Sequence, residues 1–315
     1  MDEFRSYLPD AVIFANLPET AHRLTLVTEQ ERAHIAELAA EILSEGRQPS
    51  DLLASLPDRR LPNFDENTEI LPGNSASVSK MQRLHALWQQ ILLCEELRSG
   101  LGFSKRELPD FFFPEAETVP ENQRGRVIYQ RSAYADTAYR HFSDRIDGAY
   151  ALYTHNLTAV CEEVVRGNCE YCILPLGNSA EGMMPGVAKL IDQYALRTVA
   201  SCDVPTEDGK KSTRFVLLRR NLLPLVSPMQ DDTALELVIP FSDSPSVAEL
   251  LLAAECYGLR PLHLDSGFRN LDGTSVFSIH FVFTVAQGDL CSYLLYLAMQ
   301  APDFEIRGIF RQCAL

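Results

Sequence analysis

Two stretches in the first third of the chain place apolar residues at every third or fourth position, which is the spacing of one helix face. The first begins at Thr28, where Glu31 follows three residues later as in a capping box, and it ends before Gly46. The second runs from Ser77 to Gly100. We therefore predict a helical N-terminal segment over residues 1–105, followed by a Pro-rich boundary.

From Arg126 onward, short runs of β-branched and aromatic residues alternate with helical stretches. The expected strands are 127–129, 150–153, 171–176, 196–201 and 215–218, and the expected helices are 133–142, 157–166 and 186–194. This order is typical of a mostly parallel sheet with helices on both faces. It predicts a single parallel α/β lobe over residues 126–222.

A third pattern occupies residues 233–315. Its expected elements are strand 235–241, helix 247–257, strands 259–264 and 275–285, helix 290–299 and strand 304–310, with Ser244 as the N-cap of the first helix. The order βαββαβ is that of a ferredoxin-like sandwich. The predicted fold class is therefore α/β and α+β, with a helical N-terminal segment.

The charge balance narrows the classes of partner. The chain has 315 residues, of which 28 are Lys or Arg and 43 are Asp or Glu, so its formal net charge is −15. Nucleic acid and anionic lipid both require a basic footprint, so we expect neither partner. No apolar run approaches the roughly 18 residues that span a bilayer, and the first residues lack the pattern of a signal peptide. These features predict a cytoplasmic protein without a membrane segment.

The eight cysteines are spread along the chain, mostly in apolar surroundings. Cys169 and Cys172 have the spacing of a metal or redox pair, but they run directly into an expected strand. We interpret both as buried, reduced thiols. The seven histidines show no metal-ligand spacing with the cysteines, so we expect no metal and no cofactor.

Three segments, in order, resemble the motifs of a known family. Residues 172–182 (CILPLGNSAEG) resemble V-P-I-E-N-S-x-x-G, residues 213–218 (TRFVLL) resemble the T-R-F strand, and residues 129–138 (YQRSAYADTA) resemble Y-Q-G-x-x-G-A-Y-S-E-x-A. Residues 127–315 thus resemble prephenate dehydratase followed by its regulatory ACT domain. The resemblance implies the conversion of prephenate to phenylpyruvate, water and CO₂ in phenylalanine biosynthesis.

The resemblance also implies site residues. Thr213 takes the place of the family's proton or hydrogen-bond donor to the departing hydroxyl, and Asn178 and Ser179 take the places of substrate-binding residues. Arg214 and Phe215 complete the expected substrate-binding set. The alternative reading of residues 213–215 is an ordinary strand start, because Thr and Phe favour strands.

The chain departs from the family at several of these positions. Gly177 replaces the Glu before Asn-Ser, Ala135 replaces a Ser, and the first loop is shortened to Arg131-Ser132. The ten residues from Asp203 to Ser212 are too few for a second lobe, because a compact domain needs at least about 50 residues. An open, wet site lacks the enclosure that electrostatic catalysis uses, so we expect catalysis to be lost.

The C-terminal part, residues 233–315, is expected to act as an ACT-like regulatory or dimerisation domain. Ser246, Arg260 and Asp265 take the places of the family's effector-binding segments, which points to a changed anionic or amino-acid effector. The simpler alternative is a homodimerisation module without effector.

Residues 1–105 take the place that a chorismate mutase has in bifunctional relatives. A mutase needs cationic residues that face into a helical bundle, and the chain offers Arg32, Lys80, Arg83 and Arg98. Solvated charges beside an apolar stripe are the alternative.

Three functions stay open from the sequence. We favour a degenerate, non-catalytic or regulatory homologue in aromatic amino acid (L-phenylalanine) metabolism, forming a homodimer through the ACT-like part. The second is an active dehydratase that completes its site across subunits. The third is an amino-acid-sensing module.

Overall fold

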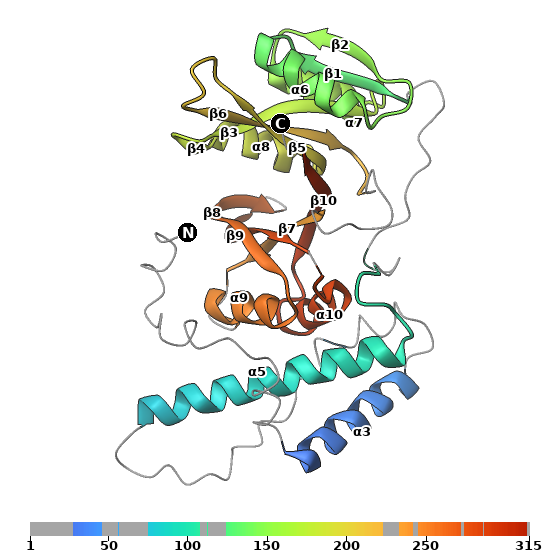
Figure 1. The fold of residues 1–315 in the computed structure, drawn as a ribbon, viewed down its shortest axis with the longest axis vertical. Coiled ribbons are helices and arrows are strands. Elements are labelled where there is room, and N and C mark those ends of the chain that lie inside the picture. The colour runs from blue at the N-terminus through green and yellow to red at the C-terminus, as the bar shows by residue number, and fades with distance from the viewer. Residues whose placement is uncertain are drawn as a thin grey trace. The chain divides into compact units, whose positions relative to one another are not determined.

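The computed structural model describes residues 28–45, 56, 75–107, 112, 124–222, 233–241, 245–271, 274–285 and 287–313. In these ranges the chain forms seven helices and a single sheet of ten strands (Figure 1). The strands are β1 (Arg126–Gln130), β2 (Tyr150–Thr154), β3 (Tyr171–Asn178), β4 (Gly182–Met183), β5 (Arg197–Pro205), β6 (Ser212–Arg219), β7 (Thr233–Pro240), β8 (Arg260–Leu271), β9 (Thr274–Thr284) and β10 (Glu305–Cys313). The helices are α3 (Glu29–Glu45), α5 (Ser75–Gly100), α6 (Ala133–Ser143), α7 (Leu157–Val165), α8 (Pro185–Gln193), α9 (Val247–Cys256) and α10 (Leu290–Gln300). The predicted fold class is confirmed.

The described residues divide into two compact units. One contains α3, α5, α9 and α10, and the other contains all ten strands together with α6, α7 and α8. The division of the sequence into segments 1–105, 126–222 and 233–315 stays a prediction.

The strands follow the order β2-β1-β3-β6-β5-β10-β7-β9-β8, and β4 pairs with β3 outside this path. β1 is parallel to β2 and β3, but β6 is antiparallel to both β3 and β5. The sheet is therefore mixed, and the prediction of a mostly parallel lobe is corrected. The reason is the short turn between β5 and β6, which has no room for a crossover and closes a hairpin instead.

Helices cover both faces of the first part of this sheet, as predicted. On one face α6 contributes Ala135, Ala138 and Phe142 to a core that also holds Phe215 and Leu217 of β6. On the other face α7 and α8 pack against a core whose β6 members are Val216 and Leu218. Successive residues of β6 thus alternate between the two cores, as strand geometry requires.

The second part of the sheet has the strand order β10-β7-β9-β8, with all neighbours antiparallel. In the chain these strands occur as β7-α9-β8-β9-α10-β10, which is the ferredoxin-like order predicted from the sequence. β10 also pairs in parallel with β5, which joins the two parts into one continuous sheet.

The N-cap of α9 is Ser246, two residues after the predicted Ser244. The Ser246 hydroxyl accepts a hydrogen bond from the Glu249 amide at 3.3 Å, and the Glu249 carboxylate accepts one from the Ser246 amide at 2.7 Å. This capping box needs a Glu three residues after the cap, which Ser246 has and Ser244 lacks.

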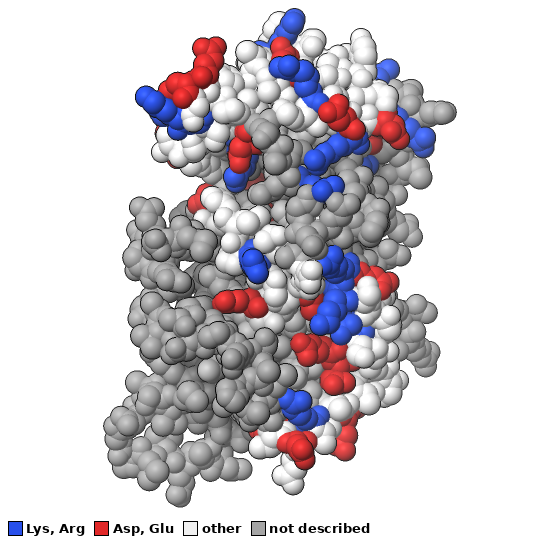
Figure 2. Space-filling model, viewed as in Figure 1, with Lys and Arg blue, Asp and Glu red and all other residues white. Residues whose placement is uncertain are grey.

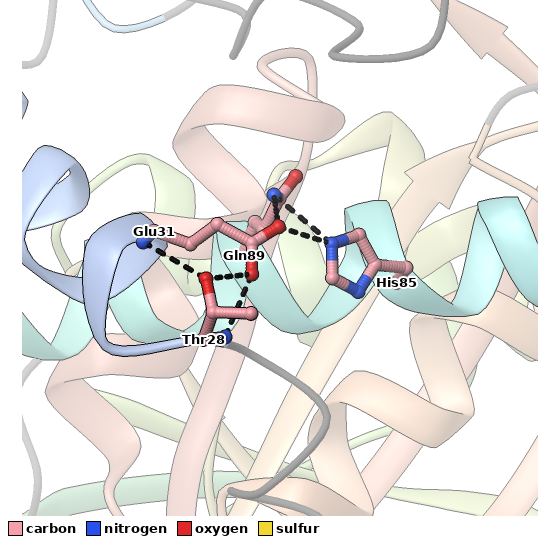
Figure 3. A network of polar contacts seen from close by, with 4 residues as sticks. All are labelled: Thr28, Glu31, His85 and Gln89. Carbon is pink, nitrogen blue, oxygen red and sulfur yellow. Dashed lines mark hydrogen bonds and ion pairs between the residues drawn. The ribbon is translucent and has the colours of Figure 1, made fainter. Parts of the chain in front are cut away.

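In the helical unit, α3 lies beside α5 and begins with the predicted capping box. Figure 3 shows how the box reaches the neighbouring helix: Glu31 accepts hydrogen bonds from Thr28 and also contacts His85 of α5 at 2.8 Å. Gln89, one turn further along α5, lies 3.4 Å from the same Glu31 carboxylate and is buried. A single carboxylate thus caps α3 and holds it to α5.

A buried ion pair ties α5 to α10. Nε of Arg98 lies 2.9 Å from the carboxylate of Asp289, and the guanidinium also donates to the Phe103 carbonyl oxygen at 2.8 Å. Asp289 is the N-cap of α10, where it accepts a hydrogen bond from the Ser292 amide. Arg98 therefore has a structural role in this unit.

The distribution of charge on the surface and the character of the helices concern two expectations from the sequence, that the chain binds no nucleic acid and has no membrane segment. Figure 2 shows basic and acidic side chains in small, interspersed groups over the described residues of one face. None of the helices formed by the described residues has the length and apolar character that crossing a membrane requires.

Candidate functional site

The motif residues Asn178 and Ser179 lie in a tight hairpin between β3 and β4. Oδ1 of Asn178 accepts hydrogen bonds from the Ala180 and Glu181 amides at 2.9 and 2.8 Å, and its Nδ2 lies 3.3 Å from the Glu181 carboxylate. The turn belongs to the Asx type, in which a side-chain oxygen replaces a backbone acceptor. The side-chain amide of Asn178 therefore forms its hydrogen bonds within its own loop.

Ser179 is hydrogen-bonded to the start of β6. Its hydroxyl accepts a hydrogen bond from the Ser212 amide at 3.0 Å, and its own amide donates to the Ser212 carbonyl oxygen at 2.9 Å. These two bonds hold the hairpin against the start of β6.

Arg214 forms a two-point ion pair across the β5–β6 hairpin. Its Nε and Nη2 lie 2.9 and 3.1 Å from the two carboxylate oxygens of Asp203, its direct neighbour in the strand register. Paired Arg–carboxylate contacts of this kind fix the guanidinium in one orientation.

Thr213 and Phe215 lie on the opposite face of β6 from Arg214. Phe215 belongs to the core beneath α6, and Thr213 pairs with Val204, another residue of that core. Because side chains alternate along a strand, Thr213 faces the α6 side and Arg214 faces the α7 and α8 side. The structure therefore places the expected donor Thr213 and the expected ligand-binding Arg214 on different faces of the sheet.

A cavity of about 290 Å³ opens on the α7 and α8 face. The charged and imidazole side chains that line it are Asp203, Arg214, Glu236, His263 and His280. Asn178, Ser179, Ser201 and Ser212 add amide and hydroxyl groups, whereas neither Thr213 nor Phe215 is among the described residues of its wall. The wall of the cavity thus includes residues of the β3–β4 hairpin and of strands β7, β8 and β9.

Glu236 and His280 form the most buried polar pair of this cavity. Nε2 of His280 lies 2.7 Å from Oε1 of Glu236, and the Glu236 residue is only 8% exposed. Burial alone would raise the pKa of Glu236, but the hydrogen bond and the charge of His280, together with a hydrogen bond from Thr198, lower it. Glu236 is therefore ionised and holds the His280 ring in place.

His263 stands beside this pair, with its ring centroid 6.5 Å from that of His280. Burial lowers the pKa of His263, and the nearby positive charges of His280 and Arg214 lower it further. The imidazole is thus neutral at pH 7, where it offers one donor and one acceptor nitrogen.

Tyr129 of the first motif and Tyr153 lie at the carboxyl ends of β1 and β2, where α/β sheets commonly bind ligands. The Tyr129 ring packs edge-on against Tyr153 and is stacked on Tyr139, and its hydroxyl donates to Asp136 at 2.9 Å. The guanidinium of Arg131 lies 5.0 Å from the centre of the Tyr153 ring. Burial raises the pKa of Tyr129, so its hydroxyl stays protonated.

Comparison with known proteins gives structural similarity only. No family model matches the chain, and none of the curated proteins matches it. The chain is similar to the X-ray structure of prephenate dehydratase from Streptococcus mutans, with 20% identity and a TM-score of 0.47 over 60% of this chain and 99% of that one. It is also similar to GqqA, described as a novel type of quorum quenching acylase, with 20% identity and a TM-score of 0.46 over 59% of this chain and 94% of that one. Prephenate dehydratase from Arthrobacter aurescens in complex with L-Phe matches with 14% identity and a TM-score of 0.44 over 59% of this chain and 89% of that one.

The three residues expected to bind an effector have separate surroundings. The Ser246 hydroxyl caps α9, and Oδ1 of Asp265 accepts a hydrogen bond from the Ser266 amide at 2.7 Å. Arg260 is exposed at the start of β8. An effector role for these residues stays a prediction.

The other candidates from the sequence are resolved in part. Cys169 and Cys172 are buried free thiols, as expected, and burial raises the pKa of Cys169 to about 11. Arg98 is held by Asp289, Arg32 is exposed on α3, and the side chains of Lys80 and Arg83 lie outside the described residues. No group of three or more His, Cys, Asp or Glu side chains suited to a metal ion occurs in the described part of the chain.

Sequence reasoning missed Glu236, His263 and His280. They come from three strands, and Glu236 and His280 are 44 residues apart. The only signal was the presence of polar residues within apolar strands, such as Glu236 in the run Leu235 to Ile239. A buried charge in such a run calls for a partner.

Proposed function

We propose that this chain is a non-catalytic, regulatory homologue of the prephenate dehydratases, acting in aromatic amino acid (L-phenylalanine) metabolism. The ordered motifs at residues 129–138, 172–182 and 213–218 support the ancestry. The loss of catalysis is supported by how the chain uses the residues between the last two motifs.

The single observation that carries the proposal is the path from Ser179 to Ser212. Every residue of this stretch is described, and it forms only β4, α8, β5 and a short turn that leads into β6. No part of it is left to form a second lobe over the motif residues. A substrate at Thr213 would therefore meet water, which weakens electrostatic stabilisation of the departing hydroxyl.

The engagement of the expected substrate-binding residues supports the same conclusion. Asn178 and Ser179 form the hairpin and its link to β6, and Arg214 is paired with Asp203. Binding a dianionic substrate through these groups would require breaking their present hydrogen bonds. Pre-organised groups, by contrast, lower the barrier because they need no such reorganisation.

The test is an assay of the purified protein with prephenate, in which formation of phenylpyruvate is followed by its absorbance. An active prephenate dehydratase in the same assay shows that the substrate and conditions are sound. We expect no turnover above the buffer rate from this chain.

Two variants show whether any turnover depends on Thr213, and so whether the proposal is wrong. Turnover by the wild type that is lost in Thr213→Ala, but kept in Thr158→Ala, would establish an active dehydratase. Thr158 is the matched control because it is an exposed threonine on α7.

We also propose that the chain forms a homodimer through residues 233–315. β8 is the last strand of the sheet path, and edge strands offer unpaired backbone groups to a second chain. Close to it, exposed Phe268 and Phe277 pack their rings at 5.2 Å, and Phe277 also meets the exposed Phe241 at 5.8 Å. Light scattering after gel filtration should give twice the chain mass, falling toward one chain mass in Phe268→Ser. A monomeric wild type would contradict the dimer.

A further inference from the structure

The cavity on the α7 and α8 face holds one imidazole between two ion pairs. On one side Arg214 is paired with Asp203, and on the other His280 is paired with Glu236. His263 lines the same cavity and forms no hydrogen bond with any other residue that the structure describes. Its two nitrogens are therefore available to a molecule in the cavity.

We propose that this cavity is a binding site for a small monocarboxylic acid, and that His263 takes up a proton when it receives the carboxylate. The site does not involve Thr213, so the inference is independent of whether the chain acts on prephenate.

The charge count of the cavity favours this ligand. Arg214 is paired with Asp203, Glu236 is ionised and held by His280, and His263 is neutral, so the described lining offers no unpaired cation before a ligand arrives. A carboxylate alone would leave one uncompensated negative charge in a partly buried site, which is costly. A proton on His263 restores the balance and gives the carboxylate a charged hydrogen-bond donor.

The groups around His263 explain why its ring becomes protonated only when an anion binds. His280 of β9 and Arg214 of β6 lower the pKa of its ring, and the acids Asp265 of β8 and Glu236 of β7 act in the opposite direction. The remaining charged group of the lining is Asp203 of β5, which faces Arg214. A carboxylate placed beside His263 would offset the effect of His280 and Arg214, which together with burial keep the ring neutral before a ligand binds.

The rest of the wall sets the size and character of the ligand. A volume of about 290 Å³ is at the small end of the range for ligand pockets. Beyond the polar groups, Leu176, Val216, Val282 and Phe310 provide an apolar surface. This combination suits a carboxylate on a short branched chain or a single ring. The Ser201 and Ser212 hydroxyls, which also line the cavity, can donate to the second carboxylate oxygen.

Calorimetric titration of the full chain with phenylacetate and with 4-methylvalerate tests the proposal. Each titration is repeated in two buffers that differ in ionisation enthalpy, because the difference reports the protons taken up per ligand bound. We expect uptake that approaches one proton near pH 8, and an affinity that falls by up to about tenfold per pH unit above the pKa of His263. Phenylacetamide, the neutral analogue, should bind at least about tenfold more weakly.

Variants separate His263 from the general effect of charge. His263→Gln keeps hydrogen-bonding groups but cannot take the proton, so binding should weaken at least about tenfold and lose its pH dependence. His34→Gln, at an exposed position on α3, should bind like the wild type. Circular dichroism melting of each variant confirms that it is folded before its affinity is compared.

Three results would each overturn the proposal. The first is no heat with either carboxylate at millimolar concentration, and the second is binding without proton uptake. The third is equal affinity of wild type and folded His263→Gln. None of these depends on prephenate turnover, so the non-catalytic assignment stands or falls separately.

Discussion

A Cβ atom on Gly177 would lie 2.5 Å from the carbonyl oxygen of Gly182. The two glycines are diagonal neighbours in the β3–β4 hairpin, where Gly177 pairs with Met183 and Gly182 pairs with Asn178. Gly182 has a φ of +77°, a conformation that other residues rarely adopt. Gly177 therefore allows β3 and β4 to approach closely, and Gly182 allows the turn between them.

Replacing Gly177 with Ala should destabilise the protein. The clash is with backbone, which cannot rotate away, so β4 must move, and the free energy of unfolding should fall by about 1–3 kcal/mol. Chemical denaturation measures this loss. Gly186→Ala in α8 is the control, because a Cβ there meets nothing within 4 Å, and it should leave stability unchanged or raise it by up to about 1 kcal/mol. Equal stability of the two variants would contradict the close approach seen at Gly177.

Most secondary structure followed from the pattern of apolar residues. The helices at α3 and α5 were predicted from their periodicity, and the strands from β-branched runs bounded by turn residues. β4 was missed because two residues, Gly182 and Met183, carry no periodic signal. The direction of β6 was missed as well, since strand patterns are alike in parallel and antiparallel sheets that are buried on both faces.

The candidate site was predictable only in part. The resemblance at 172–182 predicted substrate-binding roles for Asn178 and Ser179, and these stay predictions. The use of Asn178 within its own hairpin could not be predicted, because it depends on the hairpin geometry. The opposite faces of Thr213 and Arg214 follow from simple alternation, once β6 is known to start at Ser212. The cluster of Glu236, His263 and His280 could not be found this way, because it depends on the register of β7, β8 and β9.

Asn178→Ala should loosen the hairpin. It removes the acceptor for the Ala180 and Glu181 amides, and at roughly 1 kcal/mol or less for each exposed bond the expected loss is about 1–2 kcal/mol. Amide hydrogen exchange should accelerate at these two positions. Asn168→Ala is the control, because the Asn168 side chain makes a single exposed bond to Glu163. Unchanged exchange at Ala180 and Glu181 would argue against the Asx turn.

The ion pair between Arg98 and Asp289 should be among the costliest to break in the helical unit. Arg98→Met leaves the Asp289 carboxylate, whose residue is only 4% exposed, without its partner, so about 3 kcal/mol of stability should be lost. The double variant Arg98→Met/Asp289→Asn should recover part of that loss, because it removes the orphaned charge. Urea denaturation of both, with the wild type, tests this order.

Arg166→Met provides the surface comparison for that experiment. Arg166 lies 2.7 Å from Glu162, but their side chains are 61% and 35% exposed. Exposed ion pairs contribute little, so the loss should be under about 0.5 kcal/mol. A loss in Arg166→Met as large as that in Arg98→Met would show that burial does not decide the strength of these pairs.

The capping carboxylate of Glu31 should make the stability of the helical unit depend on pH. Burial by itself would raise the pKa of Glu31, but hydrogen bonds from Thr28 and His85 outweigh burial and lower it. A carboxyl group with a lowered pKa in the folded state stabilises the fold above its unfolded pKa of about 4.3, and this contribution is lost as the pH falls through the folded value.

The free energies of unfolding of the wild type and Glu31→Gln should therefore differ near neutral pH and converge in acid. Glu41→Gln, at an exposed position on the same helix, is the control and should match the wild type throughout. A difference between Glu31→Gln and the wild type that persists at low pH would mean that the Glu31 charge is not what joins α3 to α5.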